Sequence, residues 1–208
     1  MPDVGRGAPG CSTKDTDRFI EWLATELAPT ILGSKPATVL SFRNSAYLAA
    51  LAIWRQHGRE VLKNTLVQFL PLRYGPNLET VLFYRTDTLQ QCITDDQHKC
   101  FLRELGYPVD ESVDKCLALL RERFNHSCPH EVGVLLGIPL KDVLGFMDRA
   151  DLPLTCRKEW CIYGNPDASL AAMGKFAGDK SFVSCLIARG ANPYEILCGR
   201  SELLGNIA

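Results

Sequence analysis

Short runs of β-branched and aromatic residues, separated by helical runs, constrain the fold of this chain more than any other feature. The clearest is Thr80-Val81-Leu82-Phe83-Tyr84, which follows the turn Gly75-Pro76-Asn77, and such a composition favours a β-strand. Weaker runs of this kind lie near 37–42, 65–71 and 159–163. The order helix, strand, helix, strand, strand, several helices, strand predicts an α/β or α+β domain with a small mixed sheet of about four strands, covered by helices.

Helical spacing accounts for most of the remaining apolar residues. In the segment 110–125, Val113, Cys116 and Leu120 recur every three or four positions and share one face. Gly178-Asp179 marks a boundary, so we expect a main domain over 15–177 and a short helical C-terminal extension over 178–208. Helices are predicted over 15–27, 46–56, 86–92, 95–105, 110–125 and 167–177.

The stretch from Ser127 to Met147 predicts two short helices and carries reactive residue types at its start. Pro129 suits a first helical position, which makes Cys128 the N-cap and lets the Glu131 carboxylate reach back to the cap amide. The helix dipole would favour a thiolate at Cys128, and His130 could support it further. Cys128, His130 and Glu131 are therefore the candidate catalytic residues. The competing interpretation is that they only start the helix.

The same stretch also imitates a helix-turn-helix, with Leu136-Gly137-Ile138 at the turn. The second helix would then have to read bases. It offers Lys141 beside Asp142, Leu144 and Phe146, which is too apolar and acidic for a major-groove surface. The formal net charge of −1 gives no general attraction to nucleic acid either. We therefore prefer a structural helix pair and keep DNA binding as an alternative.

Three residues outside this stretch are candidates for ligand binding. Lys35 follows Gly33-Ser34 and precedes a predicted strand, so it could bind an anion, although no Walker spacing is present. Trp160 and Tyr163 lie in the last predicted strand and could stack on a flat ligand. A solvated loop lysine and packed strand aromatics are the competing interpretations.

The cysteines and the N-terminal stretch indicate the cellular compartment of the protein. Nine cysteines, an odd number, are scattered over the chain, and the stretch Met1–Gly10 lacks the apolar core of a signal peptide. We therefore expect a cytoplasmic protein with reduced thiols. The cysteines include no Cys-x-x-Cys pair, so no metal site is predicted. The longest apolar run, Ala46 to Trp54, is far below the ~18 residues of a membrane span.

Four segments, which together cover roughly residues 19 to 177, resemble the pattern of one bacterial family: 27–37, 101–108, 129–146 and 160–164. The third segment is the most specific. The family is an uncharacterised domain of unknown function that is common in anaerobes such as clostridia. It usually carries an aromatic residue at position 128 and a tyrosine at position 138, where this chain has Cys128 and Ile138. A catalytic Cys128 would therefore not be a family trait.

The resemblance implies no activity and leaves the cofactor unknown. We expect a non-catalytic binding or accessory protein, linked to redox or metal metabolism in an anaerobe, that works with a protein partner and binds neither membrane nor nucleic acid. The first alternative is a cysteine-dependent enzyme that uses Cys128, His130 and Glu131. The second is a helix-turn-helix DNA-binding protein.

Overall fold

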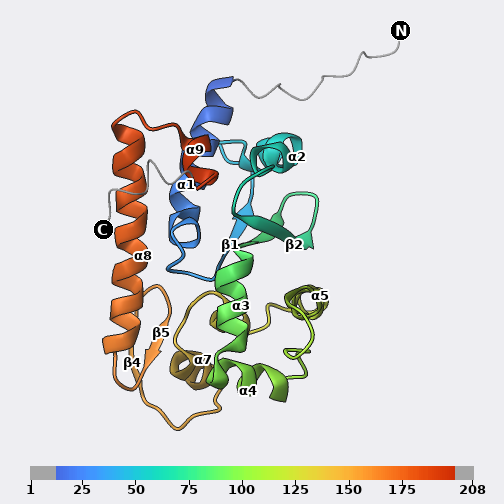
Figure 1. Cartoon of the computed structure of the whole chain (residues 1–208), viewed down its shortest axis with the longest axis vertical. Helices are drawn as coiled ribbons and strands as arrows, with labels where there is room; N and C mark the ends of the chain where they lie inside the picture. Colours follow the sequence, from blue (N-terminus) through green and yellow to red (C-terminus); the bar gives the residue numbers. More distant parts are fainter. Residues whose placement is uncertain (1–12, 200–208) are drawn as a thin grey trace.

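A three-stranded antiparallel sheet lies at the middle of the structure, a computed structural model that describes residues 13–199 (Figure 1). The strand order is β1–β3–β2. Because β2 is an edge strand, it tolerates Pro71, which lacks the N–H that a central strand needs. The strands are β1 Ala37–Phe42, β2 Gln68–Tyr74 and β3 Glu79–Tyr84.

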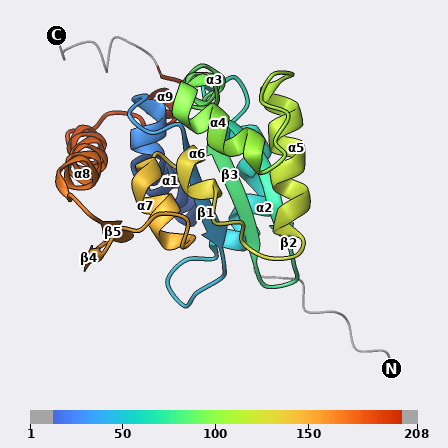
Figure 2. The same ribbon diagram turned by 90° about the horizontal axis from the view of Figure 1, so that it is seen from below.

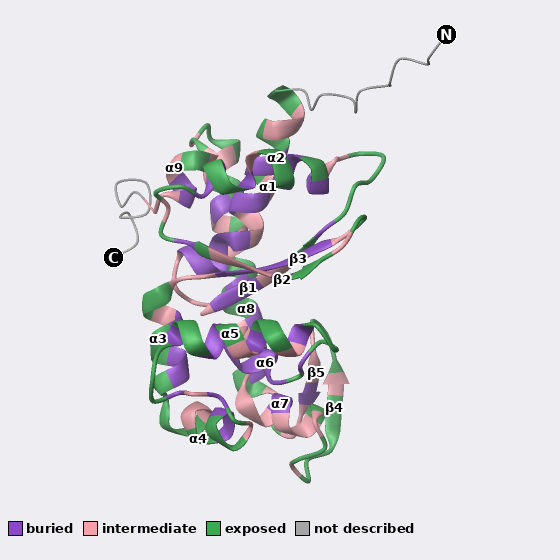
Figure 3. Cartoon of the chain, turned by 90° about the vertical axis from the view of Figure 1, so that its right-hand side faces the viewer, coloured by how far each residue is buried: buried purple, intermediate pink, exposed green. Residues whose placement is uncertain are grey.

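Helices cover both faces of this sheet, as Figure 3 shows. Side chains alternate along a strand, so the buried central strand β3 sends Val81 and Phe83 into one core and Leu82 into the other. One face carries α1 Thr13–Ile31, α2 Ala50–Val61 and α9 Pro193–Leu197. The other face carries α3 Thr86–Thr94, α4 Asp96–Glu104, α5 Val113–Phe124, α6 Val132–Leu135 and α7 Leu140–Phe146.

The two faces give two apolar cores. The upper core joins α1, α2 and α9 to the sheet and centres on aromatic residues, with the rings of Phe42 and Trp54 stacked 4.7 Å apart between centroids. The lower core joins Leu82 to buried residues of α3, α4, α5, α6 and α7. Helix α8, Asp167–Ala188, runs beside both halves of the molecule (Figure 1) and packs along α1.

The predicted mixture of helices and strands is confirmed, and the three runs near 37–42, 65–71 and 79–85 form the central sheet. The fourth run does not join them. Its residues Cys161–Tyr163 form β5, which pairs antiparallel with the unpredicted strand β4, Leu154–Arg157, in a separate two-stranded sheet. Pairing β5 with a strand nearby in the sequence closes only a short loop, and this costs less chain entropy than pairing it with the central sheet.

Helix ends differ from the prediction at both ends of the chain. The helix predicted over 15–27 continues to Ile31, and the helix predicted to end at Ala177 continues to Ala188. Gly178 therefore lies inside α8, where the packing of Val183 in the upper core offsets the weak helix preference of glycine. The division into a main domain and an extension at 177/178 stays a prediction.

Some expectations concern residues outside 13–199. The stretch Met1–Gly10 and the part of the C-terminal extension after Gly199 lie beyond the described residues. Within 13–199, none of the helices has both the length and the apolar character needed to cross a membrane.

Candidate functional site

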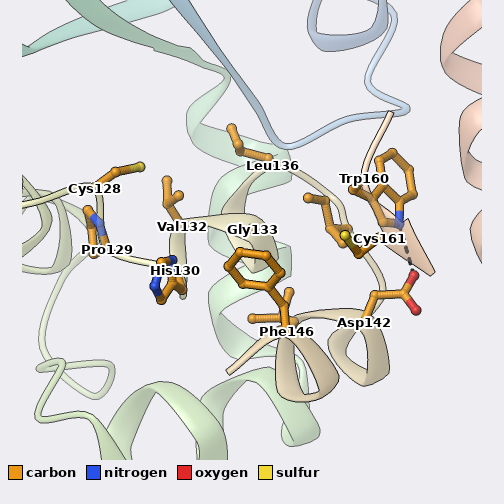
Figure 4. A pocket seen from close by; sticks show the side chains of 12 residues that line it. Cys128, Pro129, His130, Val132, Gly133, Leu136, Asp142, Phe146, Trp160 and Cys161 are labelled. Carbon is orange, nitrogen blue, oxygen red and sulfur yellow. Dashed lines mark hydrogen bonds between the residues drawn. The ribbon is translucent and has the colours of Figure 1, made fainter. Parts of the chain in front are cut away.

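An apolar cleft of about 350 Å³ opens between α6, α7 and the β4–β5 hairpin (Figure 4). This volume lies within the range of small-ligand sites. The cleft brings together three sequence-predicted residues, Cys128, His130 and Trp160. The whole lining consists of Cys128, Pro129, His130, Val132, Gly133, Leu136, Ile138, Asp142, Val143, Phe146, Trp160 and Cys161.

The predicted N-cap role of Cys128 is wrong. Residues 129–131 form a turn, in which the Val132 amide donates to the Pro129 carbonyl at 3.2 Å, and α6 begins only at Val132. Cys128 therefore lies before the turn, exposed at the rim of the cleft. Partial burial of the thiol raises the pKa of Cys128; Arg73 acts in the opposite direction and Glu131 adds to the rise. The thiol thus lacks the lowered pKa of an activated cysteine.

Glu131 is turned away from the cleft and is buried. Its Oε1 accepts hydrogen bonds from the Tyr107 hydroxyl at 3.0 Å and from Arg123 Nη1 at 2.6 Å. Burial, together with Glu131, raises the pKa of Tyr107 far above its ordinary value. Glu131 therefore ties α5 to the loop after α4, and the structure does not bring it together with Cys128 and His130 over the cleft.

His130 and Phe146 form one wall of the cleft. Their rings meet edge to face, with centroids 5.0 Å apart, an arrangement that aromatic pairs prefer. Phe146 comes from α7 and is 54% exposed, which is unusual for so large an apolar side chain. Figure 4 shows the two rings side by side at the cleft.

Asp142 lies on the floor of the cleft and is 1% exposed. It accepts hydrogen bonds from Lys141 Nζ at 2.6 Å, Trp160 Nε1 at 2.9 Å, the Tyr163 amide at 2.9 Å and Ser169 Oγ at 2.5 Å. Burial alone would raise the pKa of Asp142, but these hydrogen bonds outweigh burial and lower it. The buried carboxylate is therefore saturated with donors and joins α7, the hairpin and α8.

Trp160 and Tyr163 have different surroundings. The Asp142 hydrogen bond fixes Trp160 in the cleft wall (Figure 4). The Tyr163 ring instead packs on α7, where a Cβ added to Gly145 would lie 2.4 Å from its Cγ. Tyr163 is thus outside the cleft and acts in packing.

Lys35 also lies outside the cleft. Its Nζ sits 5.2 Å from the centroid of the Phe176 ring, and Phe176 in turn packs against Trp160. Burial, and then Lys180, lowers the pKa of Lys35, while Glu159 and Glu26 act in the opposite direction. The side chain covers an aromatic ring, and the anion-binding role of Lys35 stays a prediction.

Cys92 and His98, six residues apart in the sequence, are in contact, with Sγ and Nδ1 3.6 Å apart. The thiol also donates to the Val134 carbonyl at 3.4 Å. Burial raises the pKa of Cys92 to about 12, so this thiol packs α3 against α6. Over residues 13–199, no three His, Cys, Asp or Glu side chains lie close enough to hold a metal ion.

Sequence reasoning missed Asp142, Phe146 and Cys161 as cleft residues. It noticed the first two only as an acidic and an apolar residue on an unsuitable recognition helix. The sequence shows only that Phe146 is a large apolar residue; its exposure, which marks it as a cleft residue, appears only in the folded chain. Cys161 gave no signal, because its position depends on the hairpin.

Comparison with known proteins gives a family but no activity. The family described as "Protein of unknown function (DUF3793)" matches residues 23–197, a range that includes the whole cleft. No curated protein and no solved structure matches the chain.

Proposed function

This chain belongs to the DUF3793 family, and we propose that it is a non-catalytic binding protein whose cleft holds an apolar group of its ligand. The resemblance of its sequence to a domain of unknown function is thereby confirmed. The family description names no activity, so the geometry of the cleft has to carry the proposal.

One observation carries the proposal: the cleft is apolar, and its buried carboxylate is already saturated. The four donors around Asp142 leave no lone pair aimed at a ligand with which it could exchange a proton. The rest of the lining is mostly aliphatic and aromatic, with His130 in the wall beside Phe146. Such a cleft gains binding free energy by removing an apolar group from water.

The cysteine-enzyme alternative is supported less well. A thiol nucleophile needs a lowered pKa or an adjacent base with an orienting group. The pKa of Cys128 is raised, and Glu131 is engaged with Tyr107 and Arg123. His130 contacts Phe146.

The DNA-binding alternative is also supported less well. The would-be recognition helix α7 has seven residues, and its one lysine, Lys141, donates to Asp142, Ser169 and the Tyr163 carbonyl. A major-groove helix needs free donors and acceptors for base edges. The exposed residue Phe146 offers neither.

The expected cytoplasmic location and the protein partner are part of this proposal. The narrower link to redox or metal metabolism in an anaerobe stays a prediction from the sequence.

The cleft can be tested with N-phenyl-1-naphthylamine, a neutral dye whose fluorescence rises in apolar surroundings. We expect saturable binding to one site. Phe146→Ala should weaken binding by about threefold or more, because an exposed ring that forms the cleft wall is removed. Cys128→Trp should weaken it by narrowing the rim.

Tyr47→Ala is the matched control, because it removes an aromatic ring that is 84% exposed and lies away from the cleft. This control should bind the dye like the wild type. Absence of saturable binding, or equal affinity in the wild type, Phe146→Ala and Cys128→Trp, would show the proposal to be wrong.

A further inference from the structure

Phe146 lies between the apolar cleft and a second, polar hollow of about 580 Å³, because this residue lines both. The apolar side of this hollow is formed by Phe146, Leu152 and Tyr163. Its polar side carries the carboxylates of Asp148 and Asp151. An apolar and an acidic recess therefore adjoin on the two sides of one exposed aromatic residue.

The hollow has an excess of negative charge. Its one cation, Arg149, reaches toward α4, where Nη2 lies 3.4 Å from Glu104 Oε2 and the guanidinium lies 5.7 Å from the Phe101 ring centroid. Neither Asp148 nor Asp151 has a hydrogen bond or ion pair through its side chain to any other residue in 13–199. Two free carboxylates beside apolar walls suit a basic side chain, whose aliphatic stem and charged end need both surroundings.

The backbone of Asp148 also adopts a conformation that costs free energy for a residue with a Cβ. Its φ is +56°, and it ends α7 in a Schellman motif: its amide donates to Gly145 O at 3.2 Å, and the Arg149 amide donates to Leu144 O at 2.8 Å. Glycine is the usual residue at this position because it has no Cβ strain. An aspartate here breaks the local rule, as residues at functional sites often do.

The surface beyond the hollow suits an extended chain. Among residues 13–199, strand β4 pairs with β5 alone, and β5 lies between β4 and α7 (Figure 2). The outer edge of β4 therefore offers backbone groups for a further strand. Leu152, just before β4, and Leu154, the first residue of β4, are 36% and 43% exposed.

We propose that the cleft and the hollow together dock a segment of a protein partner that carries a lysine or arginine close to a bulky apolar side chain. The apolar side chain enters the cleft, and the basic side chain lies along Leu152 and Tyr163 with its charge at Asp148 and Asp151. This inference rests on the proposed function, because the cleft must accept the apolar group.

The test uses capped peptides that contain 4-fluorophenylalanine, followed by zero, one or two glycines and then lysine, norleucine or glutamate. Fluorine NMR reports entry of the ring into the cleft, and titration gives the affinity. The best lysine peptide should bind about three- to tenfold more tightly than its norleucine counterpart, as expected for two exposed ion pairs. The glutamate peptide should bind most weakly.

Two variants separate charge from folding. Asp148→Asn with Asp151→Asn should bring the ratio of lysine to norleucine affinities close to one. Asp148→Gly should raise the midpoint of urea unfolding, because it relieves the strained φ, and still lower this ratio. A loss of binding in this variant therefore cannot come from loss of the fold.

The possible results distinguish failure of this inference from failure of the proposed function. If the dye and the norleucine peptides bind but lysine gives no preference at any spacing, or the preference survives the double Asn variant, the inference is wrong and the proposed function stands. If neither dye nor peptide binds, both are wrong. A dimer that Phe146→Ala dissociates would assign the surface to a second copy of the chain and would also overturn the inference.

Discussion

Removing the Asp142 carboxylate should destabilise the protein strongly. Asp142→Ala leaves Lys141, Trp160, Ser169 and the Tyr163 amide without their shared acceptor. Breaking a buried ion pair on one side typically costs ~3–5 kcal/mol, because the remaining charge is left uncompensated. Lys141 keeps the Tyr163 carbonyl and the Ser169 hydroxyl as partners. We therefore expect the unfolding free energy to fall by about 3 kcal/mol, at the lower end of this range.

The pH dependence of stability should change in the same variant. The pKa of Asp142 is lowered in the folded protein, while an aspartate in the unfolded chain titrates near ~3.9. The charged carboxylate therefore stabilises the fold fully above about pH 4, and this stabilisation is lost as the pH falls through the folded pKa. Asp142→Ala lacks this contribution, so its unfolding free energy should fall less steeply in acid.

Urea unfolding followed by far-UV circular dichroism, between pH 7 and pH 3, measures both effects. Asp151→Ala is the control, because Asp151 is exposed and has no side-chain partner among residues 13–199, and it should change stability by less than about 0.5 kcal/mol. Two results would refute the view that this carboxylate joins α7, the hairpin and α8. One is that Asp142→Ala lowers the unfolding free energy by less than about 1 kcal/mol. The other is that the unfolding free energy of the variant falls as steeply with decreasing pH as that of the wild type.

Two further predictions concern packing and reactivity. Gly145→Ala should lower the unfolding free energy by about 1–3 kcal/mol, because the added Cβ would meet the Tyr163 ring. Gly174→Ala, in open space on α8, should raise the unfolding free energy by up to ~1 kcal/mol. Equal unfolding midpoints for the two variants would contradict this. Cys128 should alkylate at a rate that keeps rising beyond pH 9, because its pKa is raised above the ordinary 9.0; a rate that is already constant below pH 7, followed by mass spectrometry, would revive the nucleophile hypothesis.

The sequence predicted the central sheet well because its strands have a local signature. Thr80–Tyr84 is short, β-branched and apolar on both sides, and the structure buries both its faces between two layers of helices. Strand β4 has no such signature. Its residues Leu154–Arg157 are mostly exposed, so its existence depends on pairing with β5 and could not be predicted from periodicity.

The candidate site was predicted only in part, because capping rules use local sequence alone. They placed Cys128 at a helix start, but the helix starts at Val132 and Glu131 accepts hydrogen bonds from Arg123 and Tyr107, which lie outside the segment that the capping rules use. The roles of Asp142 and Trp160 follow from a contact between α7 and the hairpin, 18 residues apart in sequence. Sequence spacing cannot show a contact of this kind.

The upper core has a consequence for how the chain is made. Helix α1 buries Phe19 and Leu23 against residues that include Val183, Ile196 and Leu197. During synthesis, the apolar stripe of α1 leaves the ribosome before its partners in α8 and α9. At a synthesis rate of ~5–20 residues per second, these partners are made roughly 10 to 35 s after the stripe. The lower core draws mainly on residues 72–143 and can therefore assemble while the face of α1 that packs on α8 and α9 is still uncovered.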